Sequence, residues 1–356
     1  MPPVTRYDVD RTALGALLDD EPRYRVDQVW AGLHDQLATP EEMTNVPLAL
    51  RARLAASLPE GLALTTEATA DGGDTVKWLW TLADGSRVET VLMHYPQRST
   101  VCVSSQAGCA MACSFCATGQ AGFTRQLSAG EIVEQVVRAA RRARDDGRRL
   151  GNVVFMGMGE PLANYDATWT AIRRIHGDLG LGARHLTVST VGVVPGIRRM
   201  THEELPVNLA VSLHAADDAL RDELVPLNKR FGLSMLAEAC SDYIEVTGRR
   251  LSFEWALIAG VNDRPGDAAR LADYARALRA HVNLIPLNPT PGYRTRGTSP
   301  EGVEAFRSRL AERGVNVTVR HTRGTSIDAA CGQLAAGATA LASPTRRAVP
   351  VAPVAE

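Results

Sequence analysis

The feature that most constrains the fold is an alternation, from about residue 100 onward, of short apolar runs with amphipathic helical segments. The apolar runs are rich in β-branched residues and lie at 100–105, 152–157, 185–190, 207–214, 251–258, 282–287 and 315–320. Runs this apolar are typical of parallel strands that helices cover on the outer face. We therefore expect an α/β fold with a partial (β/α) barrel of about seven strands, related to the (β/α)8 design.

The helical segments between these runs carry their own boundary signals. In the segment 128–147, Ser128 and Glu131 have the spacing of a capping box, and Gly147 follows the last residue of the apolar pattern. A capping box satisfies free N–H groups at a helix start, and glycine commonly ends a helix. The sequence therefore predicts a long helix after the first strand of the barrel.

The first hundred residues follow a different pattern. Residues 24–58 carry apolar residues at helical spacing and predict helices near 26–36, 40–43 and 47–57. Residues 60–95 resemble strands separated by the turn sequences DGG and DG. We therefore predict a small N-terminal helical accessory domain (1–60), a β-rich connecting segment (61–98), a catalytic domain (99–340) and a Pro/Ala-rich disordered tail (341–356).

Composition narrows the class of protein and its compartment. Of the 356 residues, 45% are hydrophobic, which is enough for a full core. The net charge of -1 gives no overall indication of a nucleic-acid-binding protein. No run approaches the roughly 20 apolar residues of a membrane span, and the N-terminus does not resemble a signal peptide. The six cysteines then favour a reducing, cytoplasmic setting with metal or redox chemistry. A monomer is the default expectation.

Polar residues gather directly after the predicted strands, where parallel α/β folds place their chemistry. A three-cysteine loop, the segment MGEP (158–161), Ser189, Ser212 with His214, Asn288 and Cys331 each follow one of these strands. A single polar residue after a strand is usually an ordinary helix cap. Because so many of them fall on one rim, we interpret that rim as the functional site.

The loop contains Cys109, Cys113 and Cys116 in the spacing C-x3-C-x2-C. A four-iron cluster takes four thiolates when fully ligated, so three thiolates leave one iron open for a small molecule. The alternatives are a zinc site with three cysteines and one histidine, or buried free cysteines. Zinc sites usually carry C-x2-C pairs, and no Cys or His follows within 14 residues of Cys116.

This spacing, with Phe115 just before the last cysteine, resembles the radical S-adenosylmethionine (SAM) enzymes. In that superfamily the open iron of a [4Fe-4S] cluster binds SAM through its amino and carboxylate groups. The segment GMGEP resembles the part of the superfamily that meets the SAM amino group. The resemblance therefore implies one cluster per chain, held by the three cysteines.

Four further segments narrow the resemblance. They are YRVDQVWAGL (24–33), SLHA (212–215), NLIPLNP (283–289) and GTSIDAACGQL (324–334). Together they resemble the radical-SAM ribosomal RNA adenine C2-methyltransferases, over nearly the whole chain from about residue 20 to about residue 340. The resemblance implies large-subunit rRNA and tRNA as substrates, two SAM molecules per turnover, and an electron donor such as a flavodoxin. C2 of adenine is electrophilic, so a radical route replaces a polar methyl transfer.

The resemblance also implies roles for residues outside the loop. Cys331 would carry the methyl group as S-methylcysteine, Cys102 would resolve it through a transient disulfide, and Glu89 would accept the C2 proton. The SAM pocket would be lined by Gly159, Glu160, Ser189, Ser212, Leu213, His214 and Asn288. Cys240 has no such support, and we interpret it as a buried small hydrophobe.

Contacts to RNA phosphates would come from local arginines. The candidates are Arg125, Arg294, Arg296, Arg320 and Arg323 near the rim, with Arg51 and Arg53 in the N-terminal helices, which resemble the family's accessory RNA-binding module. A run of arginines between 138 and 149 is interleaved with acidic residues, which favours a solvated helix face.

Three alternative functions stay open. An enzyme that methylates C8 of the same adenine, as in antibiotic resistance, would share the cluster and both cysteines. A radical-SAM enzyme could act instead on a protein or a small molecule. A non-catalytic RNA-binding protein with a structural metal would be colourless, stable in air and indifferent to SAM.

Overall fold

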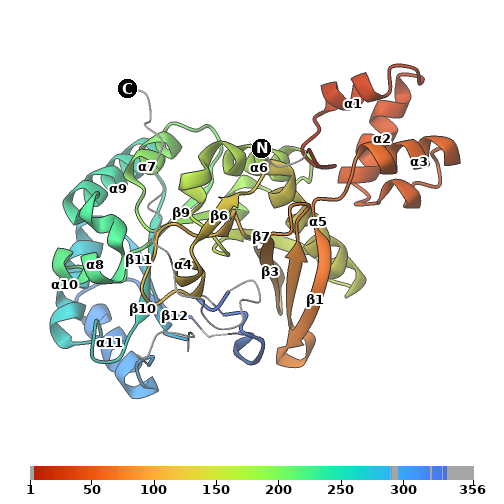
Figure 1. The fold of residues 1–356 in the computed structure, drawn as a ribbon. Helices are drawn as coiled ribbons and strands as arrows, with labels where there is room; N and C mark the ends of the chain where they lie inside the picture. Colours follow the sequence, from red (N-terminus) through yellow and green to blue (C-terminus); the bar gives the residue numbers. More distant parts are fainter. Residues whose placement is uncertain (1–3, 289, 291–295, 321–322, 331, 335–356) are drawn as a thin grey trace.

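A computed structural model describes residues 4–288, 290, 296–320, 323–330 and 332–334 of the chain. In these residues one ten-stranded sheet runs in the order β1-β2-β3-β4-β7-β8-β9-β10-β11-β12, so neighbours in sequence are mostly neighbours in space. Figure 1 shows this sheet curving around a central space, with helices on its outer side. The arrangement is a partial barrel, as the alternating pattern predicts.

The parallel part of the sheet confirms the seven predicted strands, counted over the described residues. They are β4 (Arg98–Cys102), β7 (Leu150–Phe155), β8 (Leu186–Thr190), β9 (Asn208–Ser212), β10 (Leu251–Leu257), β11 (His281–Pro286) and β12 (Val317–Val319). The side chains that point outward meet the helices and form the main core, with Phe155, Phe253 and Trp255 fully buried. Burial of such large side chains contributes roughly 1.5–3 kcal/mol each.

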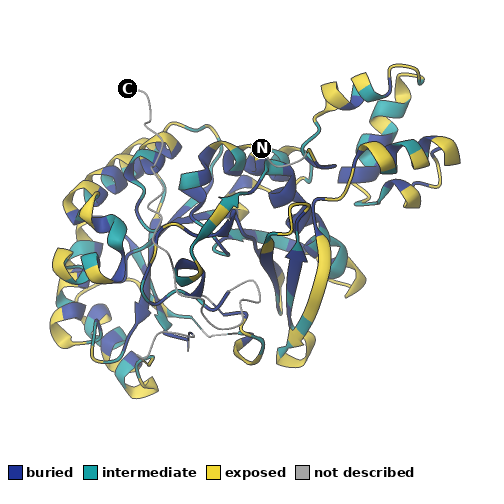
Figure 2. Ribbon diagram, in the orientation of Figure 1, coloured by how far each residue is buried: buried dark blue, intermediate teal, exposed yellow. Residues whose placement is uncertain are grey.

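Helices follow most of these strands and cover the sheet from outside. They are α5 (Ala129–Asp145), α6 (Tyr165–Gly177), α7 (Val194–Thr201), α8 (Asp218–Leu224), α9 (Leu233–Thr247), α10 (Pro265–Ala277) and α11 (Pro300–Glu312). Figure 2 shows their inner faces buried and their outer faces exposed. The capping box of α5 is confirmed, because Ser128 Oγ accepts from Glu131 N and Glu131 Oε2 accepts from Ser128 N. None of the described helices is long and apolar enough to cross a membrane.

Short 3-10 turns complete the connections among the described residues. They are η1 (Pro40–Glu42), η2 (Asp71–Gly73), η3 (Pro161–Asn164), η4 (Ala183–His185), η5 (Pro226–Lys229) and η6 (Thr325–Ile327).

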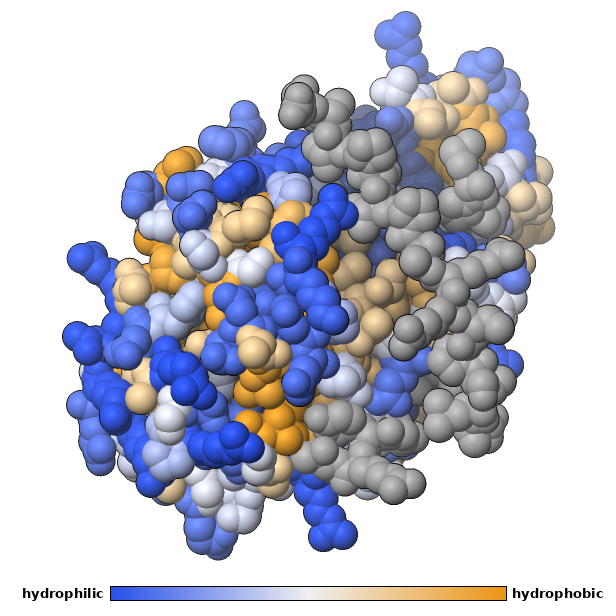
Figure 3. Space-filling model, turned by 60° about the vertical axis from the view of Figure 1, so that its left-hand side comes forward, coloured by the Kyte–Doolittle hydropathy of each residue, from blue (hydrophilic) through white to orange (hydrophobic). Residues whose placement is uncertain are grey.

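On the face in Figure 3, blue hydrophilic residues surround scattered orange apolar ones. Surfaces of this mixed kind are ordinary for folded proteins.

The three strands predicted within 60–95 are also confirmed, and they join the barrel sheet. β1 (Ala63–Ala70), β2 (Thr75–Thr81) and β3 (Arg87–Tyr95) pair antiparallel in order, and β3 pairs antiparallel with β4. The edge strand β1 is exposed over most of its length (Figure 2). The predicted connecting segment is therefore an extension of the catalytic sheet in three dimensions, and the boundaries at 60 and 98 stay predictions.

The N-terminal helices form a small bundle beside the barrel (Figure 1). The structure contains the three predicted helices as α2 (Tyr24–His34), η1 and α3 (Leu48–Ser57). It adds α1 (Arg11–Leu17), which the weak pattern of the first residues did not predict. Asp10 caps α1 by accepting from Ala13 N, and Leu14 is buried. One buried leucine in seven residues is too little to establish a helical period.

The arginines of α5 are half-buried or exposed, and two of them pair with the interleaved acidic residues Glu134 and Asp146. They also reach partners outside the helix, in the N-terminal bundle and in β1. Arg141 forms a double hydrogen bond with Glu42, and Arg138 pairs with Glu60. Arg142 pairs with Glu67 of β1, and Arg144 donates to the backbone carbonyl of Gln36. Their partners lie up to 108 residues away in sequence, so local charge patterning could not reveal them.

Candidate active site

One pocket lies at the C-terminal ends of the parallel strands, at the rim that the sequence predicts. Residues from the cysteine loop, the 157–161 segment, and the ends of β8 to β12 line it together. The predicted site residues in this lining are Cys109, Cys113, Cys116, Gly159, Glu160, Ser189, Ser212, His214 and Asn288. The fold thus brings together residues that lie as much as 179 positions apart, counted from 109 to 288.

The cysteine loop is built on a two-stranded hairpin and a short helix. β5 (Gln106–Gly108) pairs with β6 (Phe123–Gln126), and α4 (Ala117–Ala121) begins directly after Cys116. Cys109 N donates to Gly122 O at 2.8 Å, and Cys116 N donates to Cys113 O at 3.2 Å. Gly108 has φ of 74°, and a Cβ there would lie 2.0 Å from Gly122 O. Glycine is therefore required at the position where β5 lies against the backbone just before β6.

The three thiols suit a cluster better than a single ion. Burial raises the pKa of Cys109 to about 12 and raises that of Cys113 well above its ordinary value, so a metal must favour the thiolate forms. Among the described residues, no three Cys, His, Asp or Glu side chains lie close enough to hold one metal ion. The three cysteines nevertheless line one pocket, and in a [4Fe-4S] cluster each thiolate binds a different iron. The donor set fits such a cluster.

The GMGEP segment packs tightly against the residues that follow β4. A Cβ on Gly157 would lie 2.7 Å from Val103 O, and one on Gly159, at φ of 100°, would lie 2.5 Å from the Gln106 side chain. Gln106 Oε1 in turn accepts from Glu160 N at 2.8 Å. The glycines therefore allow the close approach that aims Glu160 into the pocket.

The Glu160 carboxylate is buried and held by two backbone donors. Leu162 N donates to Oε1 at 3.0 Å, and Val191 N donates to Oε2 at 2.9 Å. Burial raises the pKa of Glu160 to about 7, and these hydrogen bonds oppose the rise. A carboxylate in this setting can accept a cationic donor such as an amino group, which would lower its pKa again.

Hydroxyl groups and a neutral imidazole lie across the ends of β8 and β9. The hydroxyl oxygens of Ser189 and Ser212 are 3.3 Å apart. Burial, with Arg221 nearby, lowers the pKa of His214 to about 3, so its ring is neutral at pH 7. His214 Nδ1 accepts from Ala256 N, which leaves the proton on Nε2. The Phe115 ring meets this imidazole edge to face, with centroids 4.7 Å apart.

A buried arginine links the two loops that follow β8 and β9. Arg221 of α8 is 1% exposed, and it donates to Val191 O at 2.6 Å and to Leu213 O at 3.0 Å. It also donates to Asn228 Oδ1 at 2.8 Å. Burial lowers the pKa of its guanidinium. Leu213, which the resemblance implies in the SAM pocket, is fully buried and is not part of the pocket lining, and its carbonyl accepts from Arg221.

Glu89 and Cys102 lie on β3 and β4, on the inner face of the sheet. Cys102 pairs with Val91, so Glu89, two residues before Val91, shares its face. Cys102 also pairs with Val154 of β7, two residues before Met156, which lines the pocket. Glu89 is 3% exposed, and its carboxylate lies 3.1 Å from Lys77 Nζ. Neither Glu89 nor Cys102 is in the pocket lining itself.

The C-terminal segment after β12 returns across the sheet to this region. Ala117 N donates to Gly332 O at 2.9 Å, and Thr118 Oγ1 donates to Leu334 O at 2.6 Å. These contacts bring the segment against the cysteine loop. Cys331 lies outside the described residues, and its neighbour Ala330 is buried. Cys240 is fully buried on α9, as predicted, and burial raises its pKa to about 12.

Met156, Glu254 and Arg320 are among the pocket-lining residues that sequence reasoning did not assign to the pocket. Glu254 is 4% exposed within β10, and Arg320 follows β12. Arg320 Nη1 lies 3.6 Å from Glu254 Oε2 and 3.7 Å from Met156 Sδ, which reaches across from β12 to β7. A glutamate inside an apolar strand was the available signal, since buried carboxylates are rare without a purpose.

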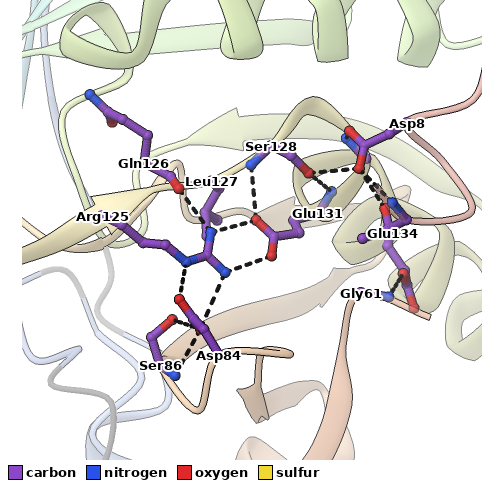
Figure 4. Close-up of polar contacts among 12 residues, drawn as sticks. Asp8, Gly61, Asp84, Ser86, Arg125, Gln126, Leu127, Ser128, Glu131 and Glu134 are labelled. Carbon is purple, nitrogen blue, oxygen red and sulfur yellow. Dashed lines mark hydrogen bonds and ion pairs between the residues drawn. The ribbon is translucent and has the colours of Figure 1, made fainter. Parts of the chain in front are cut away.

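Several candidate phosphate contacts have intramolecular partners. Arg125 is held between Asp84 and Glu131 (Figure 4), and its contact with RNA stays a prediction. Arg53 pairs with Asp20, and Arg51 donates to Glu41 O.

The remaining candidates lie near the C-terminal segment. Arg323 donates to His94 O at 2.8 Å and lies over the Tyr95 ring. Arg296 is exposed, and its backbone carbonyl accepts from Ala259 N. Arg294 lies outside the described residues.

Comparison with known proteins identifies the superfamily of this fold. The family model of the Radical SAM superfamily matches residues 103–272, which include the cysteine loop and β7 to β10. A crystal structure of a radical SAM methyltransferase from Sphaerobacter thermophilus superposes with a TM-score of 0.91 at 50% identity, covering 94% of this chain and all of that one. The fold and the three-cysteine pocket therefore define a radical SAM protein.

Curated relatives make the assignment narrower. A probable dual-specificity RNA methyltransferase RlmN from Parafrankia sp. (strain EAN1pec) is 54% identical over 333 residues, covering 88% of this chain and 86% of that one. Its counterpart from Salinispora tropica is 53% identical over 350 residues, covering 94% of each chain. The chain belongs to the RlmN family of radical SAM methyltransferases.

Proposed function

We propose that this protein methylates C2 of an adenine in large-subunit ribosomal RNA and in tRNA. The observation that carries the proposal is the convergence of the three loop cysteines and Glu160 on one pocket at the strand ends. Relatives that share more than half of its residues and are named as dual-specificity RNA methyltransferases support an RNA substrate. C2 is an electrophilic carbon, and this favours a radical route over attack on a SAM methyl group.

The cluster and SAM would lie together in this pocket. Cys109, Cys113 and Cys116 would hold the [4Fe-4S] cluster, which supplies the electron for reductive cleavage of SAM. Glu160 would accept hydrogen bonds from the SAM amino group, for which its burial and fixed orientation are suited. Gly159, Ser189, Ser212, His214 and Asn288 would complete the SAM pocket, with the Leu213 backbone behind them.

Two cysteines outside the cluster would handle the methyl group. The Cys331 thiolate would take a methyl group from a first SAM, which leaves as S-adenosylhomocysteine. The S-methyl group on Cys331 would give one hydrogen atom to the deoxyadenosyl fragment of a second SAM, and its carbon would then bond to C2, with the surplus electron returning to the cluster. Cys102 would next attack the Cys331 sulfur, breaking the carbon–sulfur bond and forming a disulfide, while the released carbon takes a proton and becomes the methyl group. Glu89 would take the C2 proton, and Lys77 Nζ lies 3.1 Å from its carboxylate. A thiol reductant then restores both cysteines.

The same proposal sets the partners. The adenine must leave its base stack to reach a buried pocket, so unpaired or unfolded RNA is the substrate form. A flavodoxin-type protein would supply electrons, and two SAM molecules would be used per turnover. We propose a monomer that works in the cytoplasm, where its RNA substrates are.

The test is mass spectrometry of digested RNA. The protein is reconstituted without oxygen with iron and sulfide, then given SAM, a reductant and an unmodified large-subunit rRNA fragment. We expect 2-methyladenosine, and we expect none from Cys331→Ala or Cys116→Ala. Cys240→Ala is the matched control and keeps activity, because its thiol is buried on α9.

Other products would discriminate among the alternatives. Formation of 8-methyladenosine would keep the fold and the cysteines but replace the C2 assignment. Cleavage of SAM without methylated RNA would reject the RNA substrate. A colourless protein that is indifferent to SAM would reject the radical mechanism altogether.

A further inference from the structure

A buried carboxylate that the proposed mechanism does not use faces the same pocket. Glu254 lies in the middle of β10 and is 4% exposed. Strand register puts its Cα opposite Ser212 of β9 on one side and opposite Asn283 of β11 on the other. Asn283 is in turn opposite Thr318 of β12. Polar residues therefore occupy aligned positions on four adjacent strands, β9 to β12, and Ser212 and Glu254 of this row line the pocket.

The two carboxylate oxygens of Glu254 have different surroundings. Oε1 accepts from Asn283 Nδ2 at 2.8 Å and from Ser252 Oγ at 3.2 Å. Oε2 is buried and has no hydrogen-bond partner among the described residues, with Arg320 Nη1 at 3.6 Å. Buried polar atoms without a partner are few in native proteins, and each calls for an explanation. A bound molecule that brings a donor into the pocket would satisfy Oε2.

The orientation of this carboxylate is fixed from behind. Asn283 Oδ1 accepts from Thr318 Oγ1 at 2.5 Å and lies 3.0 Å from His281 Nε2. Because the amide oxygen is used there, the amide nitrogen must face Glu254. Asn283 therefore acts as a positioning residue that holds Oε1, while Oε2 lies on the side of Arg320, and the Glu254 side chain is part of the pocket lining.

We infer that Glu254 is a further ligand of SAM and binds its ribose hydroxyl groups; this inference rests on the proposed function. An ionised carboxylate only accepts hydrogen bonds, and the ribose offers two adjacent hydroxyl donors. Carboxylates bind nucleotide ribose in this way in dinucleotide-binding folds. The neighbour of Glu254 in the row is Ser212, whose hydroxyl lies 3.3 Å from that of Ser189, so three oxygen groups gather at one place.

The other groups that could bring a hydrogen-bond donor into the pocket, the amino group of SAM and the target adenine, have partners on other strands. Glu160, on the far side of β8 and β9 in the sheet order, is the carboxylate suited to the amino group of SAM. The target adenine must reach Glu89 and Cys102, which are on β3 and β4, separated from β10 by β7, β8 and β9. Glu254 is therefore placed for the cofactor and not for the RNA base.

The test is calorimetric titration of the anaerobically reconstituted protein with three probes: SAM, S-adenosylhomocysteine and the 2′,3′-dideoxy analogue of S-adenosylhomocysteine. Glu254→Gln keeps the size of the side chain and removes its charge. We expect about tenfold weaker binding of SAM and of S-adenosylhomocysteine, the size of one hydrogen bond to a charged group. The dideoxy analogue should bind the variant and the parent protein equally. Glu238→Gln, at an exposed position on α9, is the matched control and should change none of the three affinities.

Each contrary outcome has its own meaning. Weaker binding of SAM but unchanged binding of S-adenosylhomocysteine would mean that Glu254 acts on the sulfonium charge, and the ribose assignment would be wrong. A variant that also loses affinity for the dideoxy analogue would reject the assignment as well. Failure of the parent protein to bind SAM at all would instead reject the proposed function. Iron content and melting temperature check that the variant is folded, and Glu254→Asp serves as a second variant, expected to show the same dependence on the hydroxyl groups.

Discussion

Replacing Arg221 with methionine tests how the loops of the pocket are held. The guanidinium donates to the carbonyls of Val191 and Leu213 and to the side chain of Asn228, at 2.6, 3.0 and 2.8 Å. Methionine has a similar length and fills most of the space, so the main effect is the loss of three donors. The two carbonyls belong to the loops after β8 and β9, which carry the wall of the pocket.

Two opposing effects set the magnitude. A buried acceptor left without a donor costs about 1–3 kcal/mol, so three acceptors give an upper range of roughly 3–9 kcal/mol. Burial lowers the pKa of Arg221, because removing its charge from water is unfavourable in the folded state. Methionine carries no charge, so the variant does not have this unfavourable contribution. Water entering the gap offsets a further part. We therefore expect the free energy of unfolding of Arg221→Met to fall by about 3 kcal/mol.

Equilibrium urea unfolding followed by tryptophan fluorescence measures this loss. Arg198→Met, at an exposed position on α7, is the control and should change stability by less than about 0.5 kcal/mol. SAM binding should also weaken, since both loops lose their common anchor. A loss below about 1 kcal/mol in Arg221→Met would refute the reasoning, because it would mean that the loops hold themselves without this side chain.

Three further outcomes can be measured. Gly159→Ala, at φ of 100° with Gln106 2.5 Å from the new Cβ, should lower the melting temperature and abolish SAM binding, and retained binding would contradict the close packing. Burial raises the pKa of Glu160 to about 7 from the ordinary 4.5, so its carboxyl stabilises the cluster-free fold fully below about pH 4.5. This contribution to the free energy of unfolding falls by about 3 kcal/mol as pH rises through 7. Urea midpoints of the parent protein and Glu160→Gln should therefore diverge between pH 5 and pH 8, and parallel curves would be the contrary result. Cys240→Ala should keep the full iron content and cost about 1 kcal/mol of stability, whereas Cys113→Ala should lose the cluster, as iron analysis will show.

The strands and the site rim could be predicted because their signals are local. An apolar run bounded by turns determines its own strand, and the C-terminal ends of parallel strands meet at one edge whatever the exact register. This is why Glu160, Ser212 and the three loop cysteines could be placed in one pocket from the sequence. The capping box of α5 was visible for the same reason, because its two partners are three residues apart.

What the sequence did not reveal depends on contacts between distant segments. The inner face of β10 is decided by register with β9 and β11, so nothing in the run LSFEWALI shows that Glu254 faces the pocket. The ion pair between Arg141 and Glu42 joins residues 99 positions apart, and the pairing of Arg125 with Asp84 spans 41. Local patterning treats such arginines as free charges, and only the fold shows their partners.

The return of the C-terminal segment has a consequence for the biogenesis of the protein. Gly324 N donates to Asp71, Lys77 donates to Asp328 O, and Thr118 donates to Leu334 O, over separations of 253, 251 and 216 residues. Closing loops of this length is entropically costly and slow, and on the ribosome the partners emerge last. We therefore expect the cysteine loop to be assembled while its cover is still being synthesised, which leaves an interval during translation when a metal-delivery protein has direct access to the thiols.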